Sequence, residues 1–148
     1  ETFYYTGLAL EALGKKEEAQ KAWRESVAQM IGEEDNPRVT VDSGAVLLYY
    51  QAMSLTKLGD TARAAKYFAT LRDTAARAMR QGAAGNEFFA KFGEQRSPRM
   101  RSAQAHYVAG LAELGLGQGL KAKAEFQKAL ELNTYLLDAR TRVQGMKQ

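Results

Sequence analysis

The residues that could do chemistry in this chain of 148 residues are few and scattered. His106 is the only histidine, and there is no cysteine, so the sequence excludes disulfides and cysteine-containing metal sites. Three serines, Ser26, Ser43 and Ser54, have no nearby base to activate them as nucleophiles. The pattern therefore predicts neither nucleophilic catalysis nor a metal site.

Two further motifs resemble functional sites, but each has a simpler structural explanation. The glycine-rich segment 115–119 follows a helical pattern rather than a strand, and no Gly-Lys-Ser/Thr signature comes with it, so a turn between helices explains it better than a phosphate loop. The acidic runs at 17–18 and 33–35 are explained by charge at a helix start and by solvation. His106 falls at an inward helix position, where we expect a core or half-buried role. We therefore predict that the chain is not an enzyme and holds no cofactor.

Composition places the chain among ordinary soluble domains, with 45% hydrophobic and 26% charged residues. The only prolines, Pro37 and Pro98, leave long stretches free to form helix. No apolar run approaches the roughly 20 residues that cross a bilayer, so we expect no membrane insertion. Because the chain opens at Glu1 inside an apparent helix, we expect a piece of a longer polypeptide. The compartment stays open, with the cytoplasm slightly favoured.

The net charge of +4 comes from basic residues spread along the chain. Their densest group is Arg96, Arg99 and Arg101, with Lys91 nearby. A nucleic-acid site needs a concentrated basic face with aromatic side chains for stacking. A solvated helix start is the simpler interpretation, so we predict no nucleic-acid partner.

Three segments of the chain share one spacing. A small residue is followed seven positions later by glycine, then after five by alanine, then after four by an aromatic residue. The three sets are Gly7, Gly14, Ala19 and Trp23; Ala52, Gly59, Ala64 and Phe68; and Gly110, Gly117, Ala122 and Phe126. Each set predicts a helix A, a turn with a left-handed glycine, and a helix B. The small residue lets the helices approach, the aromatic side chain fills the space between them and the next helix, and Asp60 is the expected N-cap of the second helix B.

This pattern resembles the tetratricopeptide repeat family, whose repeat is about 34 residues long. The resemblance implies an all-α helical-repeat solenoid of three helix-turn-helix units with two insertions and a C-terminal capping helix. In a single domain 1–148, it places the repeats at about 1–33, 45–78 and 103–134, the insertions at about 34–44 and 79–102, and the capping helix at about 135–146. It also implies a protein-protein interaction scaffold rather than a catalyst.

The residues of the two insertions and of the closing helix predict where helices begin and end. The first insertion reads as a loop that ends in a helix cap. In the second, Gly82 and Gly85 should end helix B near Arg80, and Ser97-Pro98 should begin a long third helix A. The closing helix should cover the open end of the stack. Its expected covering residues are Leu136, Leu137, Ala139, Arg140 and Val143.

The A helices of stacked repeats line a concave surface that commonly binds peptides or proteins. Two corresponding positions, four residues apart, form a tyrosine and aliphatic strip on that surface. The strip consists of Tyr4, Leu8, Tyr49, Met53, Tyr107 and Leu111. Some family members hold a C-terminal carboxylate with Lys, Asn and Arg at these positions, and this chain lacks those residues there. The strip favours an apolar or aromatic segment of a protein or peptide instead.

Two readings of the strip stay open. It is exposed to a partner, or it is covered from within by the insertion with Phe88, Phe89 and Phe92, or by another domain of the same polypeptide. If the strip is open, Tyr49→Ala should weaken partner capture and leave stability nearly unchanged. If it is covered, the same substitution should lower stability by a few kcal/mol.

Residues 86–143 also resemble the end of the repeat region in certain large bacterial multidomain proteins of unassigned activity. The matching residues are Phe88-Phe89, His106-Tyr107 and Gly115-Leu116-Gly117. This narrower resemblance implies the alternative function of an accessory repeat domain in a larger bacterial enzyme, beside a carbohydrate-active region.

Overall fold

The computed structural model describes residues 1–28, 32–33, 36–37, 39–90 and 96–146. The described residues form seven helices and one antiparallel pair of two-residue strands. The elements are α1 (Thr2–Ala12), α2 (Lys16–Ala28), β1 (Gly32–Glu33), β2 (Asn36–Pro37), α3 (Ala45–Leu58), α4 (Thr61–Ala90), α5 (Arg96–Gly115), α6 (Gly119–Leu132) and α7 (Leu137–Gly145). The predicted all-α helical-repeat solenoid is confirmed.

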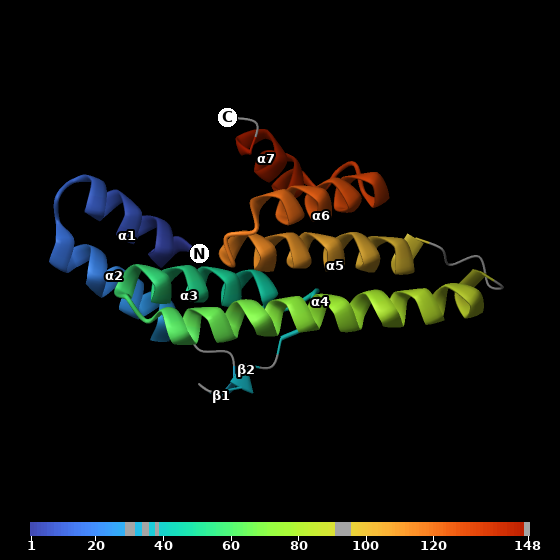
Figure 1. Ribbon diagram of the computed structural model, residues 1–148, viewed down its shortest axis with the longest axis horizontal. Helices are drawn as coiled ribbons and strands as arrows, with labels where there is room; N and C mark the ends of the chain where they lie inside the picture. The colour runs from blue at the N-terminus through green and yellow to red at the C-terminus, as the bar shows by residue number, and fades with distance from the viewer. Residues whose placement is uncertain (29–31, 34–35, 38, 91–95, 147–148) are drawn as a thin grey trace.

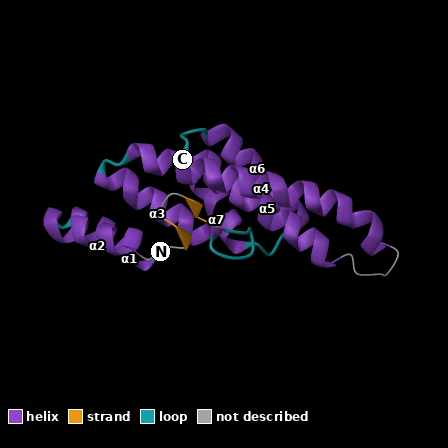
Figure 2. Cartoon of the chain, turned by 90° about the horizontal axis from the view of Figure 1, so that it is seen from below, coloured by secondary structure: helices purple, strands orange, loops and turns teal. Residues whose placement is uncertain are grey.

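The helices pack mainly against their neighbours in sequence, so that α1–α2, α3–α4 and α5–α6 form successive hairpins (Figure 1). Figure 2, turned by 90°, shows the same elongated molecule with α1 and α2 at one end. Helix α7 packs on α6 and lies on the same side of the molecule as α1 (Figure 1). None of the described helices combines the length and the apolar character that a membrane span requires.

The predicted turns form as the glycine spacing indicates. Gly14, Gly59 and Gly117 have φ angles of +77°, +86° and +75°, a left-handed conformation that only glycine adopts at little cost. The side chain of Asp60 caps the start of α4, because its Oδ1 accepts a 3.1 Å hydrogen bond from the backbone N–H of Arg63. Both the left-handed turns and the Asp60 cap are therefore confirmed.

The small residues of helix A let aromatic rings of helix B lie directly against the backbone. A methyl group added at Gly7 would lie 2.2 Å from Nε1 of Trp23, and one added at Gly110 would lie 2.5 Å from the ring of Phe126. A similar contact joins successive hairpins, since a methyl group at Gly115 would lie 2.1 Å from the ring of Phe68. The predicted close approach is confirmed within hairpins and extends between them.

Helix α4 does not end where the glycines predict. It continues through Gly82 and Gly85 to Ala90, so the expected helix end near Arg80 is wrong. A glycine inside a helix costs about 1 kcal/mol, and the packing of α4 along α5 offsets that cost. The expected long third helix A is confirmed, because α5 begins at Arg96 and spans 20 residues. The side chain of Ser97 lies outside the described part of the chain, and so does the predicted cap.

The first insertion contains more structure than the predicted loop. Gly32 lies opposite Pro37 in the short antiparallel pair of β1 and β2. Further along, Val39 and Val41 are buried in the hydrophobic core, so this segment packs under the helices. Helix α3 then starts after Gly44, whose φ of +80° turns the chain without a side-chain cap.

The closing helix α7 covers part of the stack through its small and branched residues. Ala139 and Val143 are buried in the common core, and Leu136 packs against it half-buried. Leu137 is 66% exposed, so its predicted covering role is wrong. Arg140 turns back instead of covering the stack, and its Nη2 donates a hydrogen bond to the carbonyl of Thr134.

Candidate functional site

The structure places the predicted tyrosine and aliphatic strip mostly below the surface. The exposed fractions of Tyr4, Tyr49 and Tyr107 are 7%, 2% and 3%, and Leu111 is fully buried. Leu8 and Met53 pack half-buried against the same core. These side chains therefore form the floor of the concave face rather than an open surface, and direct contact with a partner stays a prediction for them.

Ring contacts explain why the tyrosines are buried. The ring of Tyr49 lies 5.2 Å from that of Tyr50 and 6.1 Å from that of Phe68, measured between centroids. The ring of Tyr107 lies 5.8 Å from that of Phe126. Each tyrosine thus extends the aromatic packing of its own helix hairpin, in tilted or edge-on arrangements that aromatic pairs favour.

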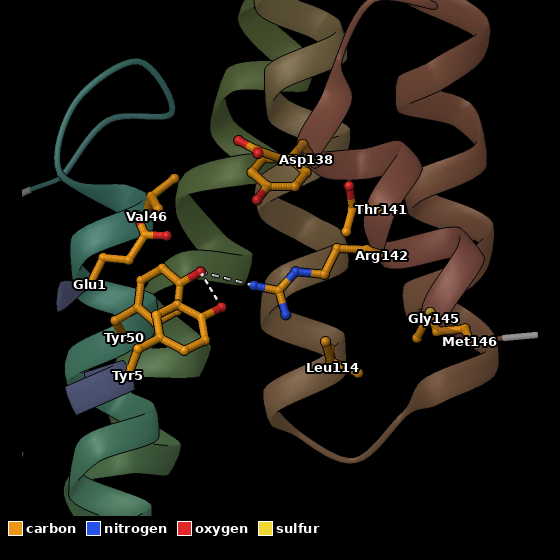
Figure 3. Close-up of a pocket in the computed structure, with 11 residues that line it drawn as sticks. Glu1, Tyr5, Val46, Tyr50, Leu114, Asp138, Thr141, Arg142, Gly145 and Met146 are labelled. Atoms are coloured by element: carbon orange, nitrogen blue, oxygen red, sulfur yellow. Dashed lines mark hydrogen bonds between the residues drawn. The ribbon is translucent and has the colours of Figure 1, made fainter. Parts of the chain in front are cut away.

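Arg142 of α7 covers the tyrosines from the solvent side. Its guanidinium carbon lies 5.4 Å from the centroid of the Tyr49 ring, a cation–π distance. Its Nη2 donates a 3.1 Å hydrogen bond to the hydroxyl of Tyr50. Figure 3 shows the side chain reaching across from α7 toward Tyr50 and Tyr5. At Tyr49 the strip is therefore covered from within, by Arg142 of α7.

The described backbone of α4 does not bring the second insertion over the strip. The backbone of residues 79–90 continues α4 away from α1 and toward the far end of the molecule (Figure 1). The side chains of Phe88 and Phe89, and all of Phe92, lie outside the described part of the chain. The backbone of α4 therefore gives no support to the alternative in which the insertion covers the strip.

A second group of tyrosines surrounds the Arg142 contact. The centroids of Tyr4, Tyr5 and Tyr50 lie 5.4 to 5.6 Å apart. The hydroxyls of Tyr5 and Tyr50 are 3.2 Å apart and share a hydrogen bond. Tyr5 is 48% exposed, so this cluster reaches the solvent through Tyr5.

An open cavity of about 450 Å³ lies at this cluster, and we call it the Tyr–Arg pocket. Four helices line it, with Tyr5 from α1, Tyr50 from α3, Tyr107 from α5 and Arg142 from α7. Further lining residues are Glu1, Val46, Leu114, Asp138, Thr141, Gly145 and Met146 (Figure 3). Tyr107 is thus the one strip residue that also lines the pocket.

Burial keeps the tyrosine hydroxyls protonated. It raises the pKa of Tyr107 to about 12, with the negative charge of Asp138 as a second cause. Burial also raises the pKa values of Tyr4, Tyr49 and Tyr50. The hydroxyls therefore stay neutral hydrogen-bonding groups at neutral pH, and Arg142, Asp138 and Glu1 are the pocket's charged groups.

His106 and Ser54, two of the residues first considered for chemistry, lie elsewhere and have structural partners. His106 is half-buried as expected, and its Nδ1 lies 2.7 Å from Oε2 of Glu125. Burial alone would raise the pKa of Glu125, but hydrogen bonds with His106 and Lys128 outweigh it and lower that pKa. The hydroxyl of Ser54 donates to the carbonyl of Tyr50. In the part of the chain that the structure describes, no three His, Cys, Asp or Glu residues are grouped so as to hold a metal ion.

Sequence reasoning missed three residues of the pocket, namely Tyr5, Tyr50 and Arg142. Two of them carried a signal, because Tyr4-Tyr5 and Tyr49-Tyr50 are paired tyrosines at equivalent positions of the first two units. Arg142 carried none, since its role depends on how α7 folds back over distant helices.

Comparison with known proteins agrees with the repeat fold. The family model described as tetratricopeptide repeat matches residues 1–29 and 47–81, which include α1, α2 and most of α3 and α4. The third unit and the segment 86–143 lie outside the match, so the narrower bacterial resemblance is not supported there. The fold and the matched segments together show a helical-repeat solenoid that resembles the tetratricopeptide repeat.

Two other comparisons add little. No curated protein matches the chain. One similar solved structure is described as "MamA RS-1 ArsTM double mutant"; it shares 21% sequence identity over 98% of this chain and 81% of that chain. The TM-score of this match is 0.30.

Proposed function

We propose that this chain is a protein-interaction scaffold that binds a peptide segment of a partner in the Tyr–Arg pocket. The observation that carries the proposal is the pocket itself, which is lined by residues of four helices of the solenoid, α1, α3, α5 and α7. Concave faces of stacked helical repeats commonly bind proteins or peptides. The partner is a separate chain or another part of the same polypeptide.

The residue types in the pocket suit a protein partner. Tyrosine and arginine are enriched among the residues that dominate binding energy at protein interfaces. The half-exposed ring of Tyr5 offers apolar area, and its hydroxyl offers a polar contact. Val46, Leu114 and Met146 add apolar wall next to these polar groups. A cavity of about 450 Å³ accommodates a few side chains of an extended peptide rather than a folded domain.

The buried strip has a supporting role in this proposal. Tyr4 and Tyr49 hold the rings of Tyr5 and Tyr50 in place through direct ring contacts. Tyr107 contributes to the wall. Leu111 belongs to the hydrophobic core, and Leu8 and Met53 pack against it, so these residues stabilise the helices that carry the rings.

A peptide-display selection against the intact 148-residue chain tests the proposal. Peptides that bind the wild-type chain are then measured against Tyr5→Ala, which removes the accessible ring of the pocket. Tyr135→Ala is the matched control, because Tyr135 is 86% exposed and does not line the pocket. We expect Tyr5→Ala to weaken binding at least about tenfold, as for a central interface aromatic, and Tyr135→Ala to leave it unchanged.

Two results would contradict the proposal. Either no peptide is selected, or the selected peptides bind Tyr5→Ala as tightly as the wild-type chain. Because Tyr5 is half-exposed, its truncation should leave the fold intact, and circular dichroism of the variant checks this.

A further inference from the structure

We propose that Arg142, with the hydroxyls of Tyr5 and Tyr50, is a subsite that binds one carboxylate group of the partner peptide. This inference rests on the proposed function and specifies the chemistry that the Tyr–Arg pocket recognises. It differs from the carboxylate-binding pattern excluded above, because the cation comes from the closing helix α7 rather than from the A helices.

The positive charge of Arg142 is not balanced by an ion pair in the described part of the chain. Across the residues that the structure describes, Arg142 contacts tyrosines, and no carboxylate forms an ion pair with it. Some basic residues nearer the surface do have such a partner, as in the pairs Lys57–Glu11 and Arg63–Asp60. A half-buried cation without an anion is costly, so a ligand carboxylate that pairs with it gains the corresponding free energy.

Arg142 and the two tyrosine hydroxyls also offer hydrogen-bond donors to a carboxylate. A guanidinium has five N–H groups in a planar fork that fits a carboxylate. The hydroxyl of Tyr50 accepts one N–H of Arg142, and it lies 3.2 Å from the hydroxyl of Tyr5, where either oxygen can be the donor. When Tyr50 donates to Tyr5, the proton of Tyr5 is available to a ligand, and Tyr5 is the exposed member of this chain of hydrogen bonds. Hydrogen bonds in series strengthen one another, so Tyr5 becomes a better donor to an anion.

The charges around the pocket limit the ligand to a single acidic group. Asp138 and Glu1 also line the pocket, and each repels a further negative charge. Figure 3 shows Asp138 one turn before Arg142 on α7, with its carboxylate away from the guanidinium. The remaining wall is apolar at Val46, Leu114 and Met146. The ligand is therefore an acidic group flanked by apolar residues, and a polyanion such as nucleic acid does not fit.

The direct test uses acetate alone, so that it does not depend on any peptide. Acetate is titrated into the isotope-labelled chain at constant ionic strength, with chloride as the reference anion, and NMR follows the side-chain N–H signals of Arg142. We expect saturable shifts at Arg142 and at the backbone signals of Tyr5 and Tyr50, and no such shifts at Arg24, an exposed arginine of α2. Equal shifts with acetate and chloride, or equal shifts at Arg24, would overturn the subsite.

The second test uses the selected peptides, with each acidic side chain replaced by its amide and, separately, with the C-terminus amidated. One of these changes should weaken binding at least about tenfold, which identifies the carboxylate as a side chain or as the chain terminus. In Arg142→Met the same change should have no effect, whereas Arg142→Lys should retain part of it. Arg140→Met is the control on the same helix, because Arg140 bonds to Thr134 outside the pocket.

These outcomes separate the inference from the proposed function. Peptides that need Tyr5 but bind equally with and without their carboxylates would overturn the subsite and leave the scaffold function standing. Acetate binding at Arg142 without any selected peptide would overturn the scaffold function and leave the subsite. Thermal melts of Arg142→Met and Arg142→Lys show whether each variant is folded, and the acid-to-amide comparison within one variant is independent of its stability.

Discussion

Arg142 donates a hydrogen bond of 3.1 Å to the hydroxyl of Tyr50, which lies 92 residues earlier in the chain. This bond joins the closing helix α7 to α3 of the second hairpin, across the face of α5. It places a cation on top of a tyrosine floor that a regular repeat would expose. The concave face of this solenoid is therefore shaped by its last helix as much as by its A helices.

Tyr49→Ala should lower the free energy of unfolding by about 3–5 kcal/mol, the range for truncating a buried aromatic side chain. Tyr49 is 2% exposed and contacts Tyr50, Phe68 and Arg142, so the substitution leaves a cavity between the second hairpin and α7. Urea unfolding measures the loss. Tyr135→Ala is the control and should change stability by less than about 0.5 kcal/mol. Equal midpoints for Tyr49→Ala and the wild-type chain would show that the concave face is open in solution.

Gly115→Ala should destabilise the chain by about 1–3 kcal/mol, because its methyl group would lie 2.1 Å from the ring of Phe68. The matched control is Gly119→Ala at the start of α6, where an added methyl group meets nothing within 4 Å. That change should be neutral or slightly stabilising, since alanine restricts the unfolded chain. The denaturant midpoint of Gly115→Ala should therefore fall, whereas that of Gly119→Ala should stay the same or rise slightly. A Gly115→Ala variant as stable as Gly119→Ala would mean that α4 and α5 are not in close contact.

Alkaline conditions should unfold the chain through its buried tyrosines. In the folded chain burial raises the pKa of Tyr107 from 10.0 to about 12, whereas in the unfolded chain this hydroxyl titrates near the ordinary value. The unfolded state therefore loses its proton first, and raising the pH favours it. Stability from this group is complete below pH 10 and is lost as the pH rises to about 12. Urea midpoints across this interval measure the loss.

The same titration has a spectroscopic check. Ultraviolet absorbance of tyrosinate should rise in at least two steps, with exposed tyrosines ionising before the buried ones. A single step near the ordinary tyrosine pKa, with the helical circular dichroism unchanged, would contradict the burial of the tyrosine floor.

Asp60→Ala should lower the melting temperature, because it removes the side-chain oxygen that caps α4. Asp60→Asn keeps an acceptor and should lose less, and Asp73→Ala on the exposed face of α4 is the control. Hydrogen bonds from Arg63 hold the pKa of Asp60 below its ordinary value. Its contribution is therefore present above that ordinary value and falls as acid protonates the carboxylate. If Asp60→Ala melts like Asp73→Ala at neutral pH, the cap contributes nothing.

Much of the fold could be predicted because it follows from local spacing. The three left-handed glycines mark the turns, and the small and aromatic positions mark which helices touch. The end of α4 could not be predicted in this way. Gly82 and Gly85 weaken a helix locally, but α5 packs along α4, and this tertiary contact outweighs the local preference.

The candidate site was predicted only in part, for a related reason. Helix periodicity correctly placed Tyr4, Tyr49 and Tyr107 on equivalent positions of successive A helices. It could not show that α7 folds back on them, because the contact between Arg142 and Tyr50 spans most of the chain and repeats no pattern. Whether a side chain at such a position is surface or floor depends on that one long-range contact.

The contact between Phe68 and Gly115 affects how cooperatively the molecule unfolds. Phe68 belongs to the second hairpin, but its ring fits against the backbone of the third, where only glycine leaves room for it. In a linear array of repeats, each unit contacts only its neighbours, and weak coupling lets the ends fray separately. A ring inserted across this boundary couples the second and third hairpins strongly. Amide hydrogens of α4 and α5 should therefore exchange with solvent in one concerted opening rather than helix by helix.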